Sequence, residues 1–167
     1  MECPSMSSRR FTPPIYCAKL TVMTYATEVP HSPLHEKLGI KIIQASSHEV
    51  IGTMPVPGNT QPAGVLHGGA TAALVEGLAS IAASMHAQPE RIAVGVDLNV
   101  THLRPAISGK VTGKTTPVRL GRRTTVHTVE IYDSTGELIA VGRLTCQLIA
   151  PRGQDSLARD RPRLQER

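Results

Sequence analysis

The chain has 167 residues, of which 40% are hydrophobic and 19% are charged, and this size and composition are typical of one globular domain. Its three cysteines, Cys3, Cys17 and Cys146, lie far apart, which argues against a disulfide framework or a zinc ribbon and fits a reducing cytoplasm. The net charge of +5 comes mostly from the two ends, and Tyr132 is the one aromatic residue after residue 25, so a base-stacking nucleic-acid surface is not expected.

The two ends of the chain differ in composition from its middle. Residues 1–33 contain many prolines and serines and no sustained hydrophobic period, which predicts an extended or disordered N-terminal arm. The first twenty residues also lack the apolar core of a secretory signal. Residues 151–167 are polar, charged and interrupted by proline, and they predict a disordered basic tail. The folded domain is therefore expected over residues 34–150.

Within this domain the hydrophobic pattern predicts two strands, one long helix and four further strands. A short helical turn at Leu34–Leu38 precedes strands at Ile40–Gln44 and His48–Val56. The segment Leu66–His86 is rich in alanine and leucine and is long enough for about five helical turns. The last four strands are predicted at residues 91–103, 109–119, 123–132 and 138–149.

The long helix is apolar on all its sides. It is long enough to cross a membrane, but two histidines, three glycines and a central glutamate argue against a membrane span. A sheet wrapped around this helix would bury it on nearly every side. The expected fold class is α+β, with an antiparallel sheet wrapped around one long central helix and no association with a membrane.

Glu76 is the only carboxylate of this helix and lies in its middle. A carboxylate in an apolar helix loses hydration unless it faces solvent, so it indicates either a function or an exposed position. Helical spacing places Ala72, Ala73, Ser80 and Ala83 on the same face, and these small residues favour a cavity wall. Ser80, one turn after Glu76, either binds water or the carboxylate, or packs as a small residue.

The start of the helix carries two successive glycines, Gly68 and Gly69, directly after His67. The N–H groups of a first helical turn are unpaired and positively polarised, so they are able to polarise a carbonyl oxygen. Gly68 and Glu76 are eight residues apart, or about 12 Å along the helix axis. Two helices lying antiparallel across a two-fold axis would bring them together, which predicts a homodimer with shared active sites.

Other polar residues allow two further interpretations. The histidines His67, His86 and His102 show no metal-ligand spacing beside Glu76, so no metal site is expected. His102 ends a strand, where it either lines the site or has a structural role. Six cations lie between residues 101 and 125 without an acidic residue, which suits either a ligand with several phosphates or a solvated strand edge. They are Arg104, Lys110, Lys114, Arg119, Arg122 and Arg123.

Three stretches of the sequence resemble one known family. The run QPAGVLHGGATAALVE at residues 61–76 is similar to the signature of hotdog-fold acyl-CoA thioesterases of the PaaI-like, 4-hydroxybenzoyl-CoA thioesterase type. The runs GVDLNVTHLRP at residues 95–105 and LGRR at residues 120–123 extend this resemblance, which covers about residues 34–149. It implies the hotdog fold, hydrolysis of an acyl-CoA, and a homodimer that often pairs again into a homotetramer.

The resemblance also implies roles for individual residues. Glu76 would be the catalytic carboxylate, as nucleophile or general base, in the branch of the family that carries glutamate instead of aspartate. The backbone N–H of Gly68 from the facing subunit would polarise the thioester carbonyl. The other implied site residues are Gln61 near the carbonyl or the water, His67 in support of the loop, Ser80 at the water, and Arg104, Arg122 and Arg123 at the CoA phosphates. No cofactor is implied, because CoA is part of the substrate.

We therefore predict a cytoplasmic thioester hydrolase that acts on an aryl- or medium-chain acyl-CoA. The alanines of the helix and the scarcity of aromatic residues favour an aliphatic pocket, which would accept medium acyl chains as readily as rings. A non-catalytic acyl-CoA-binding module is one alternative, although such a protein should lack the carboxylate. An acyl-carrier-protein thioesterase is another, since the basic stretch would attract an acidic carrier. A hydratase acting on enoyl-CoA resembles the chain less, because its Asp/His pattern is missing.

Overall fold

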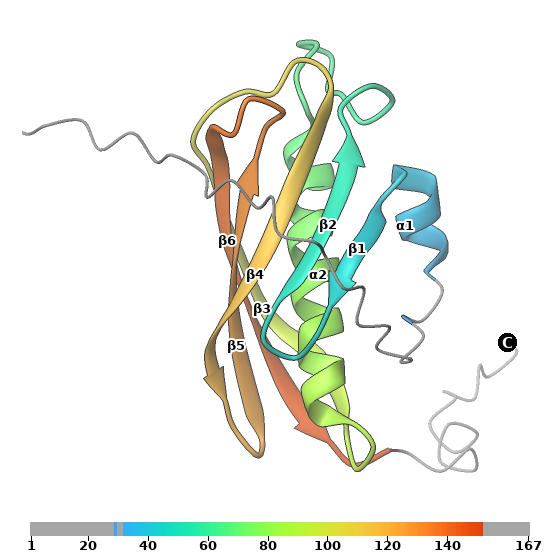
Figure 1. The fold of residues 1–167 in the computed structure, drawn as a ribbon, viewed down its shortest axis with the longest axis vertical. Helices are drawn as coiled ribbons and strands as arrows, with labels where there is room; N and C mark the ends of the chain where they lie inside the picture. The colour runs from blue at the N-terminus through green and yellow to red at the C-terminus, as the bar shows by residue number, and fades with distance from the viewer. Residues whose placement is uncertain (1–28, 30–31, 152–167) are drawn as a thin grey trace, which may run out of the picture.

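A computed structural model describes residue 29 and residues 32–151, which form one sheet of six strands with a long helix packed on it (Figure 1). The strand order is β1-β2-β4-β5-β6-β3, and every neighbouring pair is antiparallel. The strands are β1 (Lys41–Ala45), β2 (Val50–Pro55), β3 (Ile92–His102), β4 (Lys110–Leu120), β5 (Thr124–Tyr132) and β6 (Leu138–Ile149). The predicted α+β class and the predicted order of elements are confirmed.

A short helix, α1 (Pro33–Leu38), precedes the sheet and begins one residue before the helical turn that the sequence predicts. The hydroxyl of Ser32 accepts the N–H of His35 at its start, and proline occupies the first helical position. Gly39 ends the helix in a left-handed conformation with φ of 68°, which glycine adopts without strain. The predicted N-terminal arm and C-terminal tail lie almost entirely outside the described residues.

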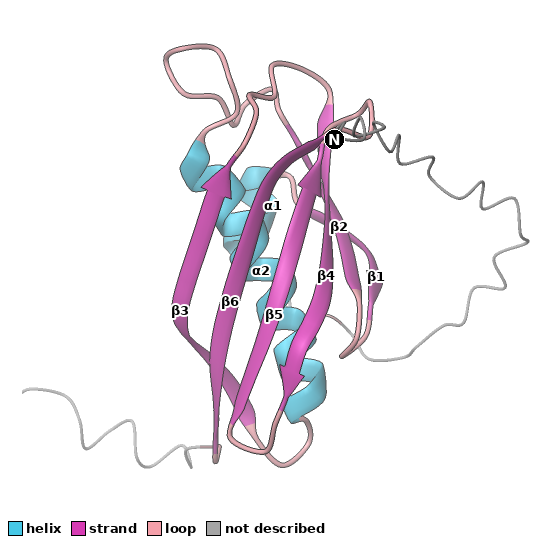
Figure 2. Ribbon diagram, turned by 90° about the vertical axis from the view of Figure 1, so that its left-hand side faces the viewer, coloured by secondary structure: helices cyan, strands magenta, loops and turns pink. Residues whose placement is uncertain are grey.

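Helix α2 (Gly68–Ala87) lies across one face of the sheet (Figure 2). Glycines in the strands below it allow a close approach. A Cβ on Gly113 would lie 2.5 Å from Cδ1 of Leu78, and a Cβ on Gly142 would lie 2.5 Å from Cγ1 of Val75. Both distances are shorter than carbon atoms tolerate, so a side chain at either position would push the helix away from the sheet.

The sheet encloses α2 less completely than the sequence predicts. A stripe of four residues, Ala72, Ala73, Glu76 and Ser80, is only half-buried, because the sheet covers the helix from one side. Ala83, which helical spacing placed with Glu76, is instead fully buried. Among the described helices, α2 alone is long and apolar enough to span a bilayer, and half of its most apolar window is buried inside the fold.

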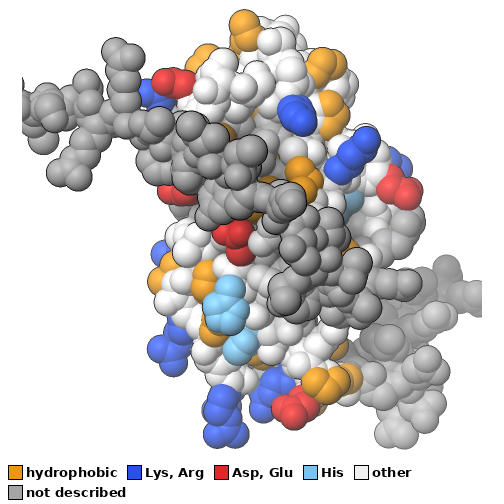
Figure 3. Space-filling model, viewed as in Figure 1, with side chains coloured by type: hydrophobic (Ala, Val, Ile, Leu, Met, Phe, Trp, Pro, Cys, Tyr) orange, Lys and Arg blue, Asp and Glu red, His pale blue; other side chains and the backbone are white. Residues whose placement is uncertain are grey.

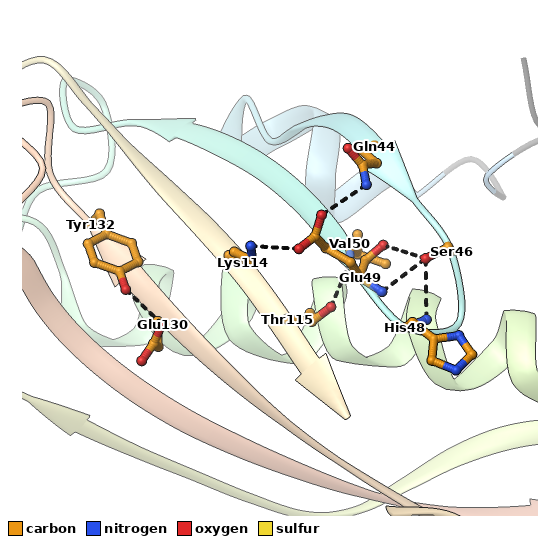
Figure 4. Close-up of polar contacts among 9 residues, drawn as sticks. All are labelled: Gln44, Ser46, His48, Glu49, Val50, Lys114, Thr115, Glu130 and Tyr132. Carbon is orange, nitrogen blue, oxygen red and sulfur yellow. Dashed lines mark hydrogen bonds and ion pairs between the residues drawn. The ribbon is translucent and has the colours of Figure 1, made fainter. Parts of the chain in front are cut away.

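Polar contacts fix the β1–β2 hairpin against β4 (Figure 4). The hydroxyl of Ser46 accepts the backbone N–H of Glu49 at 2.9 Å and lies 3.0 Å from the carbonyl oxygen of the same residue, to which it donates. The Glu49 carboxylate pairs with Nζ of Lys114 at 2.6 Å. Below the surface, the N–H of Val50 donates to the buried Oγ1 of Thr115 at 2.7 Å. These contacts hold the β1–β2 hairpin, at the edge of the sheet, against its neighbour β4.

Candidate active site

The loop that leads into α2 is anchored by Asn59. This side chain is buried, and its Nδ2 donates to the carbonyl oxygens of Leu38 at 2.8 Å and Pro55 at 2.9 Å. The backbone carbonyl of Asn59 also accepts the N–H of His67 at 2.8 Å. Between them the chain turns at Gly64, which has φ of 75°. The start of α2 is therefore held rigidly against the body of the domain.

His67 caps the helix and leaves the amide of Gly68 free. Its Nδ1 accepts the N–H of Gly69 at 2.8 Å, so that second amide of the helix is paired. The N–H groups of Gly68 and Ala70 have no acceptor among the residues that the structure describes, and of these two residues Gly68 lines the groove described below. An unpaired N–H at a helix N-terminus carries a partial positive charge, which favours an oxyanion.

Gly68 opens into a groove of about 380 Å³, which we call the Gly68 groove. Its polar lining residues are Gln61, Thr71, His102 and Arg104, and most of the remaining lining is apolar. The His102 ring packs against Gly68, because a Cβ on this glycine would lie 3.0 Å from Nε2 of His102. The structure thus brings together four of the residues that the sequence proposed: Gln61, Gly68, His102 and Arg104.

Arg104 is not a free cation in this groove. Its Nε pairs with the Glu137 carboxylate at 3.1 Å, and its Nη1 donates to the carbonyl oxygen of Leu138 at 3.0 Å. Both partners of the ion pair are more than half exposed, so the interaction is weak and a stronger anion could compete for the guanidinium.

Glu76 lies outside the Gly68 groove, facing the edge strand β3. A Cβ added to Gly95 of this strand would lie 3.7 Å from Oε1 of Glu76. Gly95 pairs with Cys146 of β6, a buried free thiol. Burial raises the pKa of Cys146 to about 11, and the negative charge of Glu76 contributes to this shift. The carboxylate therefore lies above the Gly95–Cys146 pair.

A single chain does not bring Glu76 and Gly68 together. They are eight residues apart on the same straight helix, about 12 Å along its axis. Ser80 lies one turn beyond Glu76 on the same half-buried stripe, so these two residues remain neighbours. The chain thus presents an amide at one place and a carboxylate at another.

Arg122 and Arg123 lie at the opposite end of α2 from Arg104. Together with Arg91 and Arg119 they line a hollow of about 350 Å³, which we call the arginine pocket. His86, in the last turn of α2, holds this end together through Nε2, 3.2 Å from the carbonyl oxygen of Gly121. Figure 3 shows Lys and Arg side chains gathered at the lower edge of the molecule, where Figure 1 places the β4–β5 hairpin.

Sequence reasoning missed several residues of these sites. Thr71 is buried in the wall of the Gly68 groove, and Gly95 lies beside Glu76. Arg91 belongs to the arginine pocket although it is about thirty residues from the other members, a proximity that no local motif signals. In the described part of the chain, no three His, Cys, Asp or Glu side chains come close enough to hold a metal ion.

The sequence and fold are similar to those of known thioesterases. Residues 63–140 match the model of the Thioesterase superfamily. A protein of Deinococcus radiodurans named as an esterase is 44% identical over 118 residues, which cover 70% of this chain and 74% of that protein. The 1,4-dihydroxy-2-naphthoyl-CoA hydrolase of Escherichia coli is 37% identical over 113 residues, covering 67% of this chain and 83% of the relative.

A solved structure agrees with these sequence matches. The crystal structure of a thioesterase from Haemophilus influenzae superposes with a TM-score of 0.69 at 39% identity, over 72% of this chain and 85% of that chain. The superposition shows that the two proteins also share the arrangement of their strands and helix. This chain therefore belongs to the thioesterase superfamily, as a thioester hydrolase with the hotdog fold.

Proposed function

We propose that the protein hydrolyses an aryl- or medium-chain acyl-CoA to the free acid and CoA. The observation that carries this proposal is the unpaired N–H of Gly68 in a largely apolar groove, at the N-terminus of the helix that also carries Glu76. The amide is suited to polarise a thioester carbonyl, and the carboxylate is suited to activate water. A thiolate is a good leaving group, so these two groups suffice without a catalytic triad.

The active site needs two subunits in this proposal. β3 is an edge strand of the sheet, and its apolar side chains are exposed although some of them point to the inner face. Leu98 pairs with the buried Leu144 yet is 41% exposed, which indicates that something further covers it. An antiparallel second copy along β3 would cover this edge and bring the Gly68 amide of one subunit to Glu76 of the other.

The chemical step follows from this arrangement. Glu76, acting as general base, takes a proton from water while the water oxygen bonds to the thioester carbonyl carbon. The carbonyl oxygen becomes an oxyanion and is stabilised by the Gly68 N–H. When the C–S bond breaks, the electron pair leaves with the CoA sulfur, which takes up a proton. Direct attack by the Glu76 carboxylate, through an anhydride that water then hydrolyses, would use the same two groups.

Gln61, Ser80 and His102 support this step in our proposal. Gln61 and His102 line the Gly68 groove, where they would contact the carbonyl or the pantetheine arm. Ser80 would help place the water beside Glu76. His67 acts indirectly, because its contact with Gly69 fixes the turn that aims the Gly68 amide.

The arginine pocket would hold the phosphates of CoA. Its residues form no ion pair with any residue that the structure describes, so their charge is available to a ligand. Ala87, at the end of α2, is eleven residues beyond Glu76, or about 16 Å. The carboxylate and the pocket therefore belong to one subunit, and Gly68 and Arg104 to the other. The same charge would also attract an acidic acyl carrier protein, which is the second candidate substrate class.

We also propose that the protein is a homotetramer and is located in the cytoplasm. The family resemblance suggests that two dimers pair into a homotetramer, which light scattering of the purified protein would test. Cys146 is buried as a free thiol, which agrees with a reducing compartment such as the cytoplasm.

Thiol release from short-, medium- and aryl-chain acyl-CoAs tests the proposed function. Wild-type protein should turn over at least one class, and Glu76→Gln should abolish that turnover while the protein stays folded. Faster turnover of carrier-protein thioesters than of CoA thioesters would favour the carrier alternative. If no thioester is hydrolysed but acyl-CoA still binds, the protein is a binding module and the proposal is wrong.

A further inference from the structure

The glycines on the inner face of the sheet fall into two classes. At Gly52, Gly113 and Gly142 an added Cβ would lie 2.5 to 2.6 Å from a side chain of α2. Glycine is needed there because the helix and the sheet approach closely. Gly95 is different, because its nearest neighbours would be Cδ1 of Leu144 at 3.5 Å and Oε1 of Glu76 at 3.7 Å, which are ordinary contacts.

Backbone conformation does not explain Gly95 either. The glycines with positive φ lie in turns, and Gly95 is not among them. A bulge follows between Gly95 and Asp97, but the residue before this bulge has an ordinary backbone that any amino acid adopts. Neither packing within the protomer nor backbone geometry therefore requires glycine at this position.

Because Gly95 has no side chain, the space beside the Glu76 carboxylate stays open. A methyl group on Gly95 would touch Oε1 of Glu76 from the side of β3. Reacting atoms must come within about 3 to 3.5 Å of each other, so an acyl carbonyl and its water have to occupy the immediate surroundings of this oxygen. The atoms attached to the carbonyl carbon would then lie above the Gly95–Cys146 pair.

We propose that Gly95 determines acyl-group size, because its lack of a side chain keeps open the space in which the acyl group lies beside Glu76. The inference rests on the proposed role of Glu76 and adds a specificity-determining residue from the neighbouring strand. Leu144 bounds the same space, since its Cδ1 would lie 3.5 Å from a Cβ on Gly95. A larger residue at position 95 selects against acyl groups that are wide next to the carbonyl.

The alternative is that Gly95 serves packing between two copies of the chain along β3. The two explanations differ in what a methyl group changes. A packing defect lowers the activity on all thioesters by the same factor and weakens the dimer. A change in the acyl space alters the ratio of activities on large and small acyl groups and leaves the dimer intact.

The test compares Gly95→Ala with Gly142→Ala, a matched substitution that collides with Val75 instead. We expect Gly95→Ala to lower kcat/KM about tenfold more for the widest acyl-CoA that the wild type hydrolyses than for the smallest. Its melting temperature and its elution in size-exclusion chromatography should match the wild type. Gly142→Ala should lower the melting temperature and leave the ratio of the two activities unchanged.

Two results would overturn the inference. An unchanged activity ratio in Gly95→Ala, or a dissociated dimer with equal losses on all substrates, would make Gly95 a packing residue. Glu76→Gln, measured on the same substrates, separates this outcome from failure of the proposed function. If Glu76→Gln is inactive while Gly95→Ala keeps its activity ratio, the function stands and the role of Gly95 is wrong. If Glu76→Gln is fully active, the catalytic role of Glu76 fails, and the inference about Gly95 fails with it.

Discussion

Nδ1 of His67 accepts the backbone N–H of Gly69 at 2.8 Å, and this contact pairs the second amide of α2 while the first remains free. The cap thus occupies the amide of Gly69 and leaves the amide of Gly68 available to a ligand. Gly68 lines the groove that also contains Gln61 and His102. In the proposed mechanism, helix geometry and one side-chain cap would provide the oxyanion site, without a dedicated side-chain donor.

Two substitutions test the proposed role of the Gly68 N–H as a hydrogen-bond donor, because one removes this N–H and the other keeps it. Proline at the first helical position fits the helix and removes the donor, and His67 already has the extended backbone that a residue before proline needs. Gly68→Pro should lower kcat by about 100-fold or more. Gly68→Ala is the control, because it keeps the N–H while making the same contact with His102. Equal losses in both variants would show that crowding of His102, and not the amide, matters.

If each active site is shared between two subunits, two inactive variants should form active hybrid dimers when they are mixed. In a hybrid of Glu76→Gln and Gly68→Pro subunits, one site carries both defects and the other is intact. Random exchange of subunits should therefore give about a quarter of the wild-type rate. The rate is measured after the two variants are unfolded and refolded together, with each variant alone as control. Mixtures as inactive as their parents would place both groups in one subunit.

The arginine pocket predicts a change in KM that depends on the phosphates of the substrate. Arg122→Ala and Arg123→Ala should each raise KM for an acyl-CoA about tenfold, because a charge-assisted hydrogen bond is lost. The corresponding N-acetylcysteamine thioester, which has no phosphate, should be hydrolysed as by the wild type. Arg143→Ala is the matched control, since this exposed arginine pairs with Asp97 instead. An unchanged KM for acyl-CoA would remove the pocket from the substrate site.

Because His127 is buried, we expect the protein to lose stability in mild acid. The Nε2 of His127 lies 3.3 Å from the carbonyl oxygen of Ser47, and burial lowers its pKa below 6.5, with His86 and His48 adding to this effect. Because the folded pKa is the lower one, the unfolded chain takes up a proton first as the pH falls. The contribution of neutral His127 to the free energy of unfolding is complete above about pH 6.5. It decreases as the pH falls from there toward the lower pKa of the folded protein.

Urea unfolding at several pH values between about 7.5 and 5 measures this dependence. His127→Gln keeps an amide donor for the Ser47 carbonyl but does not titrate. The free energy of unfolding of this variant should therefore fall less steeply with decreasing pH than that of the wild type. Identical slopes in the two proteins would assign the acid sensitivity to other groups.

The buried contact between Thr115 and the Val50 amide predicts a stability effect that is separate from activity. Thr115→Val keeps the shape of the side chain but leaves the N–H of Val50 unpaired in the core. We expect a loss of about 1 to 3 kcal/mol in the free energy of unfolding. Thr116→Val, on the exposed side of the same strand, should change it by less than about 0.5 kcal/mol. Chemical denaturation compares the two, and equal effects would contradict the role of this hydrogen bond.

Most of the architecture follows from periodicity within the sequence. The alternation of strands β3 to β6 and the alanine-rich segment of α2 are local patterns, so the class, the order of elements and most boundaries were predictable. The sequence also proposed Glu76 and Gly68 as site residues, because an isolated carboxylate and a glycine pair in an apolar helix are unusual. Their separation of eight residues already required two copies of the helix for a common site.

Contacts between distant segments could not be predicted in this way. Arg91 joins Arg122 only because the end of α2 and the β4–β5 hairpin meet at one end of the sheet, and the same geometry separates both from Arg104. Gly95 lies beside Glu76 through the register of β3 and β6. Ala83 is buried although it shares a helical face with Glu76, so helical spacing alone does not decide its exposure.

The sequence by itself determined the fold class, the central helix and the two groups on it that suit thioester hydrolysis, because each depends on a pattern within a few neighbouring residues. Only the tertiary structure decided which residues line the groove at Gly68, which arginines share a pocket and what lies beside the carboxylate. These properties depend on strand register and on the side from which the sheet covers the helix, and both are fixed by packing across the whole domain.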